Sequence, residues 1–351
     1  MTDRIGKLQS LIAKSGIDCL FISSLSDIYY LTGFTGSTAL LFADRQSAVF
    51  LTDGRYEEQI RSELPENIDT IIVTSYQEAV AAVGGRYKKI HVTYACSLLD
   101  YETLKGAGCE VDVDRANLVG SLRIIKSPEE TAQIRAMYDA AYAGFVNSLS
   151  VFVSGNTEDH WAAELEKQMK LSGARTVSFD TIVASGARGA LPHGIATRKV
   201  VEKNDAVVVD YGCRLNYCSD VTRLVITGDN AEAEKIADIV YTALKKASDF
   251  IREGVTAKEA DAVARDYIES KGYGKYFNHS LGHGVGIDVH EKPSLNKRDE
   301  TVLKAGMIVT VEPGIYLPGS LGVRLEDTVL VTENGCENLT AVFDRYIYKT
   351  I

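Results

Sequence analysis

Five residues of metal-binding type are spread over the C-terminal half of the chain, and they set the first hypothesis. They are Asp210, Asp220, His283, Glu312 and Glu326. Each lies in or beside an apolar run rich in β-forming residues. Charged side chains are rarely buried unless they are paired or bind a metal, so this pattern predicts a site for more than one divalent cation. A metal-dependent hydrolase is the chemistry we expect.

Four histidines strengthen this hypothesis. His279, His283 and His290 lie close together in the sequence HSLGHGVGIDVHE, and His193 lies in LPHG. The glycines around His283 let the backbone come close to whatever that side chain binds. The run GHGVG lacks the spacing and the lysine of a phosphate-binding loop, so we set that alternative aside.

Two candidate β-hairpins would position the four carboxylates. The sequences VVVDYG and SDVTRLVIT form the arms of the first, and IVTVEPG and GVRLEDTVLVT form those of the second. Each hairpin has one acid in its first arm and another in its second arm. Turn residues follow both hairpins. Two such hairpins facing each other would place four carboxylates around one centre, which we interpret as pseudo-symmetry within one domain.

The N-terminal part of the chain alternates short strands with helical stretches, which predicts a small α/β domain over residues 1–121. We expect strands at Asp18–Ser23, Ala39–Phe42, Ala48–Leu51, Ile71–Thr74 and Ile90–Thr93, and helices around Tyr56–Glu63 and Tyr76–Val83.

A second domain is expected over residues 122–351. Ser127, followed by proline and then by Glu130 at the third helical position, predicts a helix start. Thr157 is the expected cap of a second helix that ends at Gly173. Thr256 is the expected cap of a third helix, which ends at Gly272.

Composition excludes several classes of function. The chain has 351 residues, 45% of them hydrophobic and 25% charged, with a formal net charge of -10. This balance argues against nucleic acid or an anionic membrane as a partner, and no stretch has the length of a membrane-spanning helix. Six cysteines without tight pairing are typical of reduced thiols in the cytoplasm. Cys213 and Cys218 are only a weak zinc signal, and we expect them to pack in the core or in a hairpin.

The segment His279–Glu291 resembles the signature of the aminopeptidase P and prolidase family, within the wider methionine aminopeptidase and creatinase superfamily. Other motifs in the order and spacing of that family are YLTGFTG (30–36), TDGRY (52–56), LPHG (191–194), VDYG (209–212), SDVTR (219–223), VEPG (311–314) and GVRLED (322–327).

The resemblance implies an α/β creatinase-like N-terminal domain, which caps the site and supports dimers, and an α+β "pita-bread" catalytic domain. It implies two divalent metal ions, with Asp220 and Glu326 bridging them. Asp210 would bind one ion, and His283 with Glu312 would bind the other. Hard oxygen ligands favour manganese, with cobalt or zinc as alternatives. The ions would activate a water molecule that attacks a peptide carbonyl.

The same resemblance implies further roles. Glu312 would also move the proton of the attacking water, and His193 and His290 would stabilise the tetrahedral intermediate or orient the peptide. His279 and Arg324 are expected to recognise substrate or to support the residues that do. For Arg324 an ion pair that orients Glu326 or its neighbour Asp327 is an equally good interpretation.

One departure from the family concerns the first hairpin. Asp210 and Asp220 are ten positions apart, whereas the family usually separates them by one residue more. We place the loss at the hairpin tip, near Asn216 and Tyr217. If the turn absorbs the shortening, both aspartates still face the site; otherwise one of them turns away.

The leading hypothesis is a proline-specific metallo-exopeptidase of the cytoplasm, a homodimer that acts on small peptides with proline at the second position. The segment Tyr30–Ser37 favours an Xaa-Pro aminopeptidase over the alternative, an Xaa-Pro dipeptidase. A methionine aminopeptidase would lack the N-terminal domain, and a creatinase-type hydrolase would lack the metal ligands. A binding protein that kept the fold and lost catalysis is the remaining alternative, and only the shortened hairpin supports it.

Overall fold

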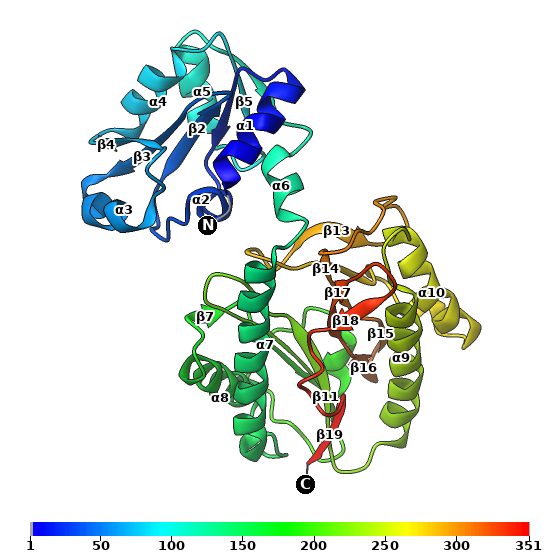
Figure 1. The fold of residues 1–351 in the computed structure, drawn as a ribbon. Helices are drawn as coiled ribbons and strands as arrows, with labels where there is room; N and C mark the ends of the chain where they lie inside the picture. The colour runs from blue at the N-terminus through cyan, green and yellow to red at the C-terminus, as the bar shows by residue number, and fades with distance from the viewer. Residues whose placement is uncertain (1–2, 351) are drawn as a thin grey trace. The chain divides into compact units, whose positions relative to one another are not determined.

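The computed structural model describes residues 3–350. The chain divides into two compact units, Met1–Arg123 and Ile124–Ile351, and each unit is considered by itself (Figure 1). A separate cluster of buried apolar side chains fills the first unit, and two such clusters fill the second.

The first unit is built on a six-stranded sheet with the order β4-β3-β2-β1-β5-β6. Strands β1, β2 and β3 pair antiparallel, and the remaining neighbours pair parallel. The strands are β1 (Cys19–Ile22), β2 (Leu40–Asp44), β3 (Ala48–Asp53), β4 (Asp69–Val73), β5 (Lys89–Val92) and β6 (Glu110–Val113). The five strands expected from the sequence are confirmed. Strand β6 was not predicted because its sequence EVDV is half acidic and none of its residues is buried.

Within residues 3–123 the α-helices are α1 (Arg4–Ser15), α2 (Leu25–Thr32), α3 (Glu57–Glu63), α4 (Tyr76–Gly84), α5 (Leu98–Gly106) and α6 (Leu118–Arg123), with the short 3-10 turn η1 (Gly54–Tyr56). The two predicted helical stretches correspond to α3 and α4. Helix α2 was missed, although Ser24 caps it by accepting a hydrogen bond from the Asp27 amide, and Gly33 ends it with φ of 82°.

The second unit has four long helices, α7 (Pro128–Ser148), α8 (Glu158–Leu171), α9 (Ala231–Phe250) and α10 (Ala257–Ser270), and three short 3-10 turns, η2 (Leu149–Val151), η3 (Gly186–Ala190) and η4 (Gly274–Tyr276). The capping boxes at Ser127 and Thr256 are confirmed. Thr157 is the N-cap residue of α8, as expected, although its side chain caps no backbone amide and instead donates to the Asp159 carboxylate. Helix α9 was missed, although Asn230 caps it.

Four sheets complete the second unit: β8-β9-β11-β19 with four strands, β13-β12-β14-β17-β18 with five, and two ribbons, β7-β10 and β15-β16. Their bounds are β7 (Thr176–Val177), β8 (Ile182–Ser185), β9 (Ala206–Tyr211), β10 (Cys213–Arg214), β11 (Val221–Thr227), β12 (Gly282–Gly284), β13 (Glu291–Leu295), β14 (Ile308–Val311), β15 (Gly314–Leu317), β16 (Leu321–Arg324), β17 (Asp327–Val331), β18 (Cys336–Asn338) and β19 (Ile347–Thr350).

Side-chain alternation along β9 decides which face of the sheet carries the site. Val207 and Val209 pack in the cluster that contains α7 and α8, whereas Ala206 packs in the cluster that contains α9 and α10. Because strand side chains alternate with a period of two, Asp210 lies on the same face as Ala206. Helices therefore cover the sheet on both sides, as Figure 1 shows.

The first predicted hairpin is confirmed as the antiparallel pair β9–β11, with Asp210 opposite Thr222. The register runs unbroken to the bridge between Arg214 and Cys218, which leaves a three-residue tip, 215–217. Asp220 lies two residues from Thr222, so both aspartates share one face. The turn at the tip therefore keeps both carboxylates on the side of the site.

The second predicted hairpin is also confirmed, in two segments. Strand β14 pairs with β17, placing Val311 opposite Asp327, and β15 pairs with β16, placing Gly314 opposite Arg324. Both segments follow one register, and the ladder is interrupted between them. In this register Glu312 is opposite Glu326, and both residues lie in the gap between the two paired segments.

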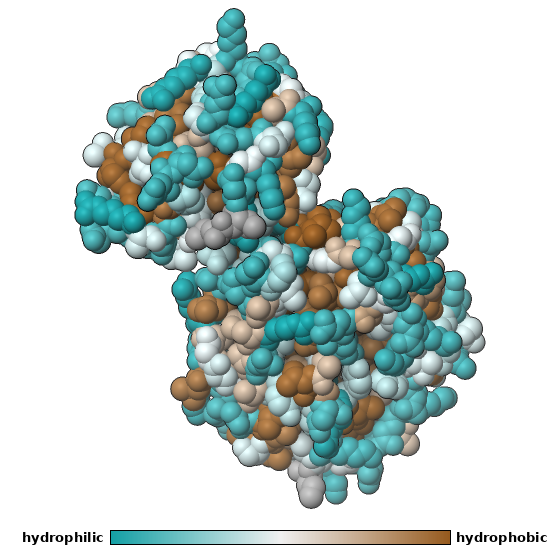
Figure 2. Space-filling view, in the orientation of Figure 1, coloured by the Kyte–Doolittle hydropathy of each residue, from teal (hydrophilic) through white to brown (hydrophobic). Residues whose placement is uncertain are grey.

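No helix in the described residues is long and apolar enough to cross a membrane. Hydrophilic side chains cover most of the face of each unit that Figure 2 shows, with apolar side chains scattered among them.

The close approach of the two arms at Gly212 gives a test of the first hairpin. A Cβ at this position would lie 2.0 Å from the backbone oxygen of Ser219. We expect Gly212→Ala to destabilise the second unit by about 1–3 kcal/mol, because the clash is with backbone that cannot rotate away. Urea unfolding in EDTA, followed by the fluorescence of the single tryptophan, Trp161, measures this effect. The control is Gly335→Ala, where a Cβ meets nothing within 4 Å; equal midpoints for both variants would contradict the prediction.

Candidate metal centre

Three buried carboxylates from different strands converge in the second unit. Asp210 is the next-to-last residue of β9, Asp220 precedes β11 and Glu326 precedes β17. One oxygen of each lies within 4.8 Å of the others, and the three residues are 9%, 5% and 1% exposed. The two hairpins thus bring their acids to one point, as their pattern predicts.

His283 and Glu312 complete the cluster. The Nε2 atom of His283 lies 3.2 Å from Oε1 of Glu312 and 3.5 Å from Oδ2 of Asp220. On the other side of the ring, Nδ1 lies 3.1 Å from the carbonyl oxygen of Gly284. A proton on Nδ1 donated to that carbonyl leaves Nε2 free to act as a ligand. All five residues singled out in the sequence are therefore brought together.

Two carboxylate oxygens in this cluster are buried without a hydrogen-bond donor among the described residues. They are Oδ1 of Asp210 and Oε1 of Glu326. A buried charged oxygen without a partner is costly, and native proteins rarely leave one so. The donor set is four carboxylates and one imidazole, which are ligands for a divalent cation. The residues present therefore fit a metal site.

Electrostatics in the metal-free protein point the same way. Burial, followed by repulsion from Asp210 and Glu312, raises the pKa of Asp220 well above its usual value. Burial and the charge of Asp220 do the same to the pKa of Glu326. Burial also raises the pKa of Asp210, against the attraction of Arg324. Burial therefore favours the protonated form of these carboxyl groups, and a bound cation would compete with those protons.

The pair formed by Glu312 and His283 behaves differently. Burial opposes the charge on both groups, but their mutual hydrogen bond and attraction outweigh it. The pKa of Glu312 is lowered to about 2, and the pKa of His283 is raised to about 9. Without a metal, His283 is the cation that neutralises Glu312.

Arg324 is a buried hub behind the cluster, 3% exposed. Its Nη2 donates to Oδ2 of Asp210 at 2.6 Å, and its Nε donates to the Thr222 hydroxyl at 3.1 Å. Its Nη1 lies 2.7 Å from the Tyr316 hydroxyl and donates to the carbonyl of Pro192 at 3.0 Å. Its contacts with the protein favour a supporting role over direct contact with substrate.

The expected ion pair of Arg324 with Glu326 or Asp327 was wrong. Its carboxylate partner is Asp210, whereas Asp327 pairs with Arg223 at 3.3 Å. Glu326 accepts from the Thr222 hydroxyl at 2.9 Å. For Asp327 the reason is the strand period, because residues 324 and 327 differ by an odd number of positions and point to opposite faces.

The remaining histidines surround the cluster at different depths. His279 is partly buried, with its Nε2 3.0 Å from the Tyr316 hydroxyl. His290 and His193 are exposed. The ring of His290 lies 4.3 Å from that of His283 between centroids. Burial, the charge of His283 and that of His193 all lower the pKa of His290. Of the four histidines singled out in the sequence, His193 and His290 are thus the two whose side chains are exposed to solvent.

Several supporting residues were not found from the sequence. Thr222 bonds Glu326, Tyr316 contacts His279 and Arg324, and Tyr138 accepts from the Asp220 amide at 3.3 Å. The period of two could have identified Thr222, which lies two residues after Asp220. Nothing in the local sequence of helix α7 marks Tyr138.

Cys213 and Cys218 are both buried, as expected. Cys213 donates to the Met137 carbonyl and Cys218 to the Ile287 carbonyl. Burial raises the pKa of the two thiols to about 11 and about 12 respectively. Their contacts are those of packing residues in the hairpin.

Known proteins resemble this chain over nearly its whole length. Residues 132–333 match Metallopeptidase family M24, and residues 4–125 match the Creatinase/Prolidase N-terminal domain. A protein named Xaa-Pro dipeptidase from Pyrococcus horikoshii is 37% identical over 345 residues, covering 97% of each chain.

Solved structures agree. A structure described as Xaa-Pro dipeptidase from Bacillus anthracis matches with a TM-score of 0.93 and 37% identity, over 99% of each chain. A structure described as X-Pro aminopeptidase from Thermotoga maritima matches with a TM-score of 0.90 and 36% identity, over 99% of this chain and 100% of that one.

These comparisons confirm the expected creatinase-like N-terminal domain and pita-bread catalytic domain, and they confirm that the protein is an enzyme that binds a divalent metal. The cluster of carboxylates and histidine lies within the matched catalytic region. The chain belongs to Metallopeptidase family M24.

Proposed function

We propose that the protein is a dinuclear exopeptidase that hydrolyses the peptide bond between an N-terminal residue and a following proline. The observation that carries the metal part is the convergence of five ligand residues around two buried carboxylate oxygens without donors. The proline specificity is supported by similarity to Xaa-Pro dipeptidases and to an X-Pro aminopeptidase over nearly the whole chain.

The proposed ligand assignment follows the family resemblance. Asp210, Asp220, His283, Glu312 and Glu326 would hold two ions, which we propose to be manganese because the ligands are mostly hard oxygens. Asp220 and Glu326 would serve both ions, Asp210 would serve one, and His283 with Glu312 would serve the other. The second oxygen of Asp210 stays on Arg324. The 3.2 Å approach of His283 to Glu312 supports a shared position for these two.

When bound, two divalent ions would hold a water molecule, lower its pKa and polarise the peptide carbonyl. Glu312 accepts the proton of the attacking water and passes it on to the leaving proline nitrogen. His193 and His290, both exposed, donate hydrogen bonds to the substrate as negative charge develops on the carbonyl oxygen. His279 contacts the Tyr316 hydroxyl, which accepts a hydrogen bond from Arg324, and Arg324 holds Asp210 in place.

The dipeptidase form of the activity gains support over the aminopeptidase form that the sequence favoured. Relatives named Xaa-Pro dipeptidase cover nearly the whole chain. The segment Tyr30–Ser37, which suggested an aminopeptidase, has a structural role inside the first unit: Tyr30 is 4% exposed and donates to the Leu122 carbonyl. The family resemblance also leads us to propose a homodimer, which sedimentation would test.

Substrate length separates the two activities. We expect the enzyme, stripped with EDTA and restored with Mn²⁺, to cleave Xaa-Pro dipeptides with a higher kcat/KM than Xaa-Pro-Yaa tripeptides, and to leave Xaa-Ala peptides intact. Steady-state rates on matched peptides measure the preference. A higher kcat/KM on tripeptides would assign the aminopeptidase form, and equal cleavage of Xaa-Ala peptides would contradict proline specificity.

Removing one bridging ligand tests the metal assignment. We expect Asp220→Ala to reduce tightly bound metal from two ions to about one per chain and to lower kcat by about 100-fold or more, because a bridging carboxylate serves both ions. Metal content after gel filtration measures the stoichiometry. Asp299→Asn is the control, since this carboxylate accepts hydrogen bonds from the Ser294 and Thr301 amides in the turn after β13 and pairs with Lys292, and it is none of the five proposed ligands. An unchanged stoichiometry in Asp220→Ala would exclude its role as a ligand.

Metal loading should release protons. The pKa of about 9 for His283 means that the metal-free site holds a proton at neutral pH, and the raised pKa values of Asp220 and Glu326 act in the same direction. Cations must displace bound protons, so the affinity for Mn²⁺ rises with pH until His283 is deprotonated. Calorimetry in buffers of different ionisation enthalpy counts the protons. A binding constant independent of pH would show that the site is already deprotonated.

A further inference from the structure

The exposed His193 lies on a long connection between β8 and β9 that contains little regular structure. The connection begins with the turn η3 and continues through Leu191-Pro192-His193-Gly194. Turn hydrogen bonds shape it around His193: the Leu191 amide donates to the Arg188 carbonyl at 2.9 Å, the Gly194 amide to the Leu191 carbonyl at 3.0 Å, and the Ile195 amide to the His193 carbonyl at 2.9 Å. Such a loop needs anchors if it is to hold an imidazole at a fixed place.

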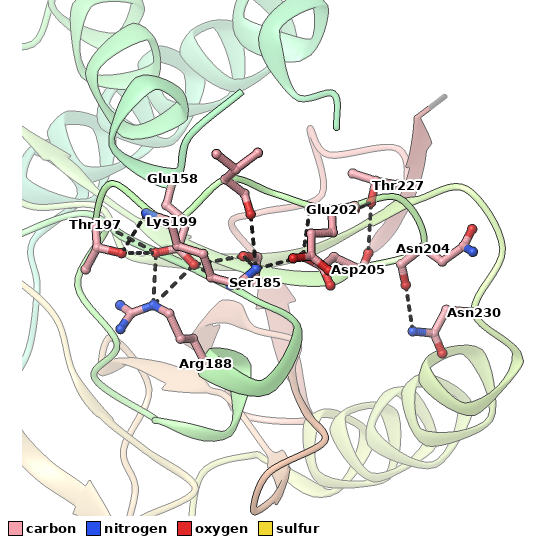
Figure 3. Close-up of polar contacts among 11 residues, drawn as sticks. Glu158, Ser185, Arg188, Thr197, Lys199, Glu202, Asn204, Asp205, Thr227 and Asn230 are labelled. Atoms are coloured by element: carbon pink, nitrogen blue, oxygen red, sulfur yellow. Dashed lines mark hydrogen bonds and ion pairs between the residues drawn. The ribbon is translucent and has the colours of Figure 1, made fainter. Parts of the chain in front are cut away.

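Glu158, the first residue of helix α8, is one such anchor. Its side chain is fully buried at 0% exposure and accepts hydrogen bonds from both ends of the loop (Figure 3). Oε1 accepts from the Ser185 amide at 2.9 Å and from its hydroxyl at 2.8 Å. Oε2 accepts from the Thr197 amide at 3.2 Å and from its hydroxyl at 2.8 Å. One carboxylate thus joins residues twelve positions apart.

Arg188 extends this anchor into the loop itself. Its Nε donates to Oε2 of Glu158 at 3.0 Å, and its Nη2 donates to the carbonyl of Ile195 at 2.6 Å. The guanidinium therefore ties the segment before His193 to the segment after it, and Glu158 holds the guanidinium. A buried carboxylate that accepts from a charged donor and from four neutral donors has its charge well compensated.

The opposite side of the loop is held from the metal centre. Arg324, which bonds Asp210, also donates to the Pro192 carbonyl, the residue next to His193. Gly189 lies against the backbone of Gly322, where a Cβ would come within 3.0 Å of the amide nitrogen. The loop is thus fixed between Glu158 at its base and the strand β16 at its side.

We propose that Glu158, acting through Arg188, Ser185 and Thr197, is a positioning residue for His193 in the hydrolytic reaction. It contacts neither substrate nor metal ligand. The carboxylate closes the loop at its base and so sets where the imidazole meets the substrate. The inference rests on the proposed function, because it takes its importance from the role of His193.

A purely structural role of Glu158 at the start of α8 is the competing explanation. If Glu158 only stabilises the fold, its replacement should lower the unfolding midpoint, and it should lower kcat by the same factor whether or not His193 is present. A positioning role acts only through His193, so the two effects must be non-additive. The pair Glu158→Gln and His193→Ala, with the double variant, distinguishes the explanations.

We expect Glu158→Gln to lower kcat by about 10- to 100-fold, since small displacements of catalytic groups cost this much, while metal content stays unchanged. In the His193→Ala background the same substitution should lower kcat by less than about twofold. Arg188→Met removes the contact with Glu158 and the one with the Ile195 carbonyl from a partly exposed position, so it provides a second variant if Glu158→Gln folds poorly. It should lower kcat in the same direction and be equally non-additive.

The matched control is Asp44→Asn in the first unit. Asp44 is also a carboxylate with several donors, accepting from the amides of Gln46 and Ser47 and from the Tyr87 hydroxyl. This variant should leave kcat unchanged.

A readout that is independent of activity follows the loop directly. Trypsin cuts after arginine, and Arg188 is held in the loop by its bonds. We expect Glu158→Gln to be cleaved after Arg188 at least tenfold faster than the parent protein, with the product identified by mass spectrometry.

The outcomes separate the two proposals. If His193→Ala retains full kcat, the proposed role of His193 fails, whatever trypsin shows. If His193→Ala is impaired but Glu158→Gln and Arg188→Met keep full kcat, only the positioning role of Glu158 is overturned. Additive losses in the double variant would also overturn it, by assigning Glu158 to stability alone.

Discussion

The structure of the second unit depends on one constraint, the convergence of three buried carboxylates, Asp210, Asp220 and Glu326, with the partly buried Glu312 beside His283. Such groups repel one another and lose their hydration on burial, and apolar packing does not compensate the free energy of either effect. The protein meets the constraint with fixed positive charge at two points: Arg324 beside Asp210 and, without metal, a protonated His283 beside Glu312. The unpartnered oxygens of Asp210 and Glu326 remain as the place where a cation is needed.

The supporting residues connect this constraint to the substrate side of the site. Arg324 contacts a proposed ligand through one nitrogen and the loop of His193 through another. Its contact with Tyr316 extends the connection to His279. A single guanidinium thus links three groups that the sequence suggested separately. Its planar shape and fixed donors suit such a hub better than a lysine would.

Much of the site was predictable because strand geometry converts sequence spacing into direction. The two acid-bearing hairpins follow from alternating apolar residues and turn signals, and the family motifs identified their acids. The partner of Arg324 was mispredicted because residues near in sequence were preferred over Asp210, which lies far from it along the chain. Strand β6 was missed because its sequence is half acidic and unburied, and helix α9 was missed although Asn230 caps it. Tyr138 was missed because only tertiary packing brings α7 next to Asp220. The contacts of Glu158 were likewise invisible, since they join a helix start to a distant loop.

Tyr217, at the tip of the first hairpin, shows that the turn is more than a connection. Its side chain is 2% exposed, and its hydroxyl donates to Glu130 on α7 at 2.7 Å. The hairpin is therefore fixed at two places. Helix α7 holds its tip through Tyr217, and the two aspartates on its arms lie at the metal site. An added residue in this turn would either break the hydrogen bond of Tyr217 to Glu130 or shift the register of the arms that carry the aspartates. The length of the turn is therefore matched to the distance between helix α7 and the metal site.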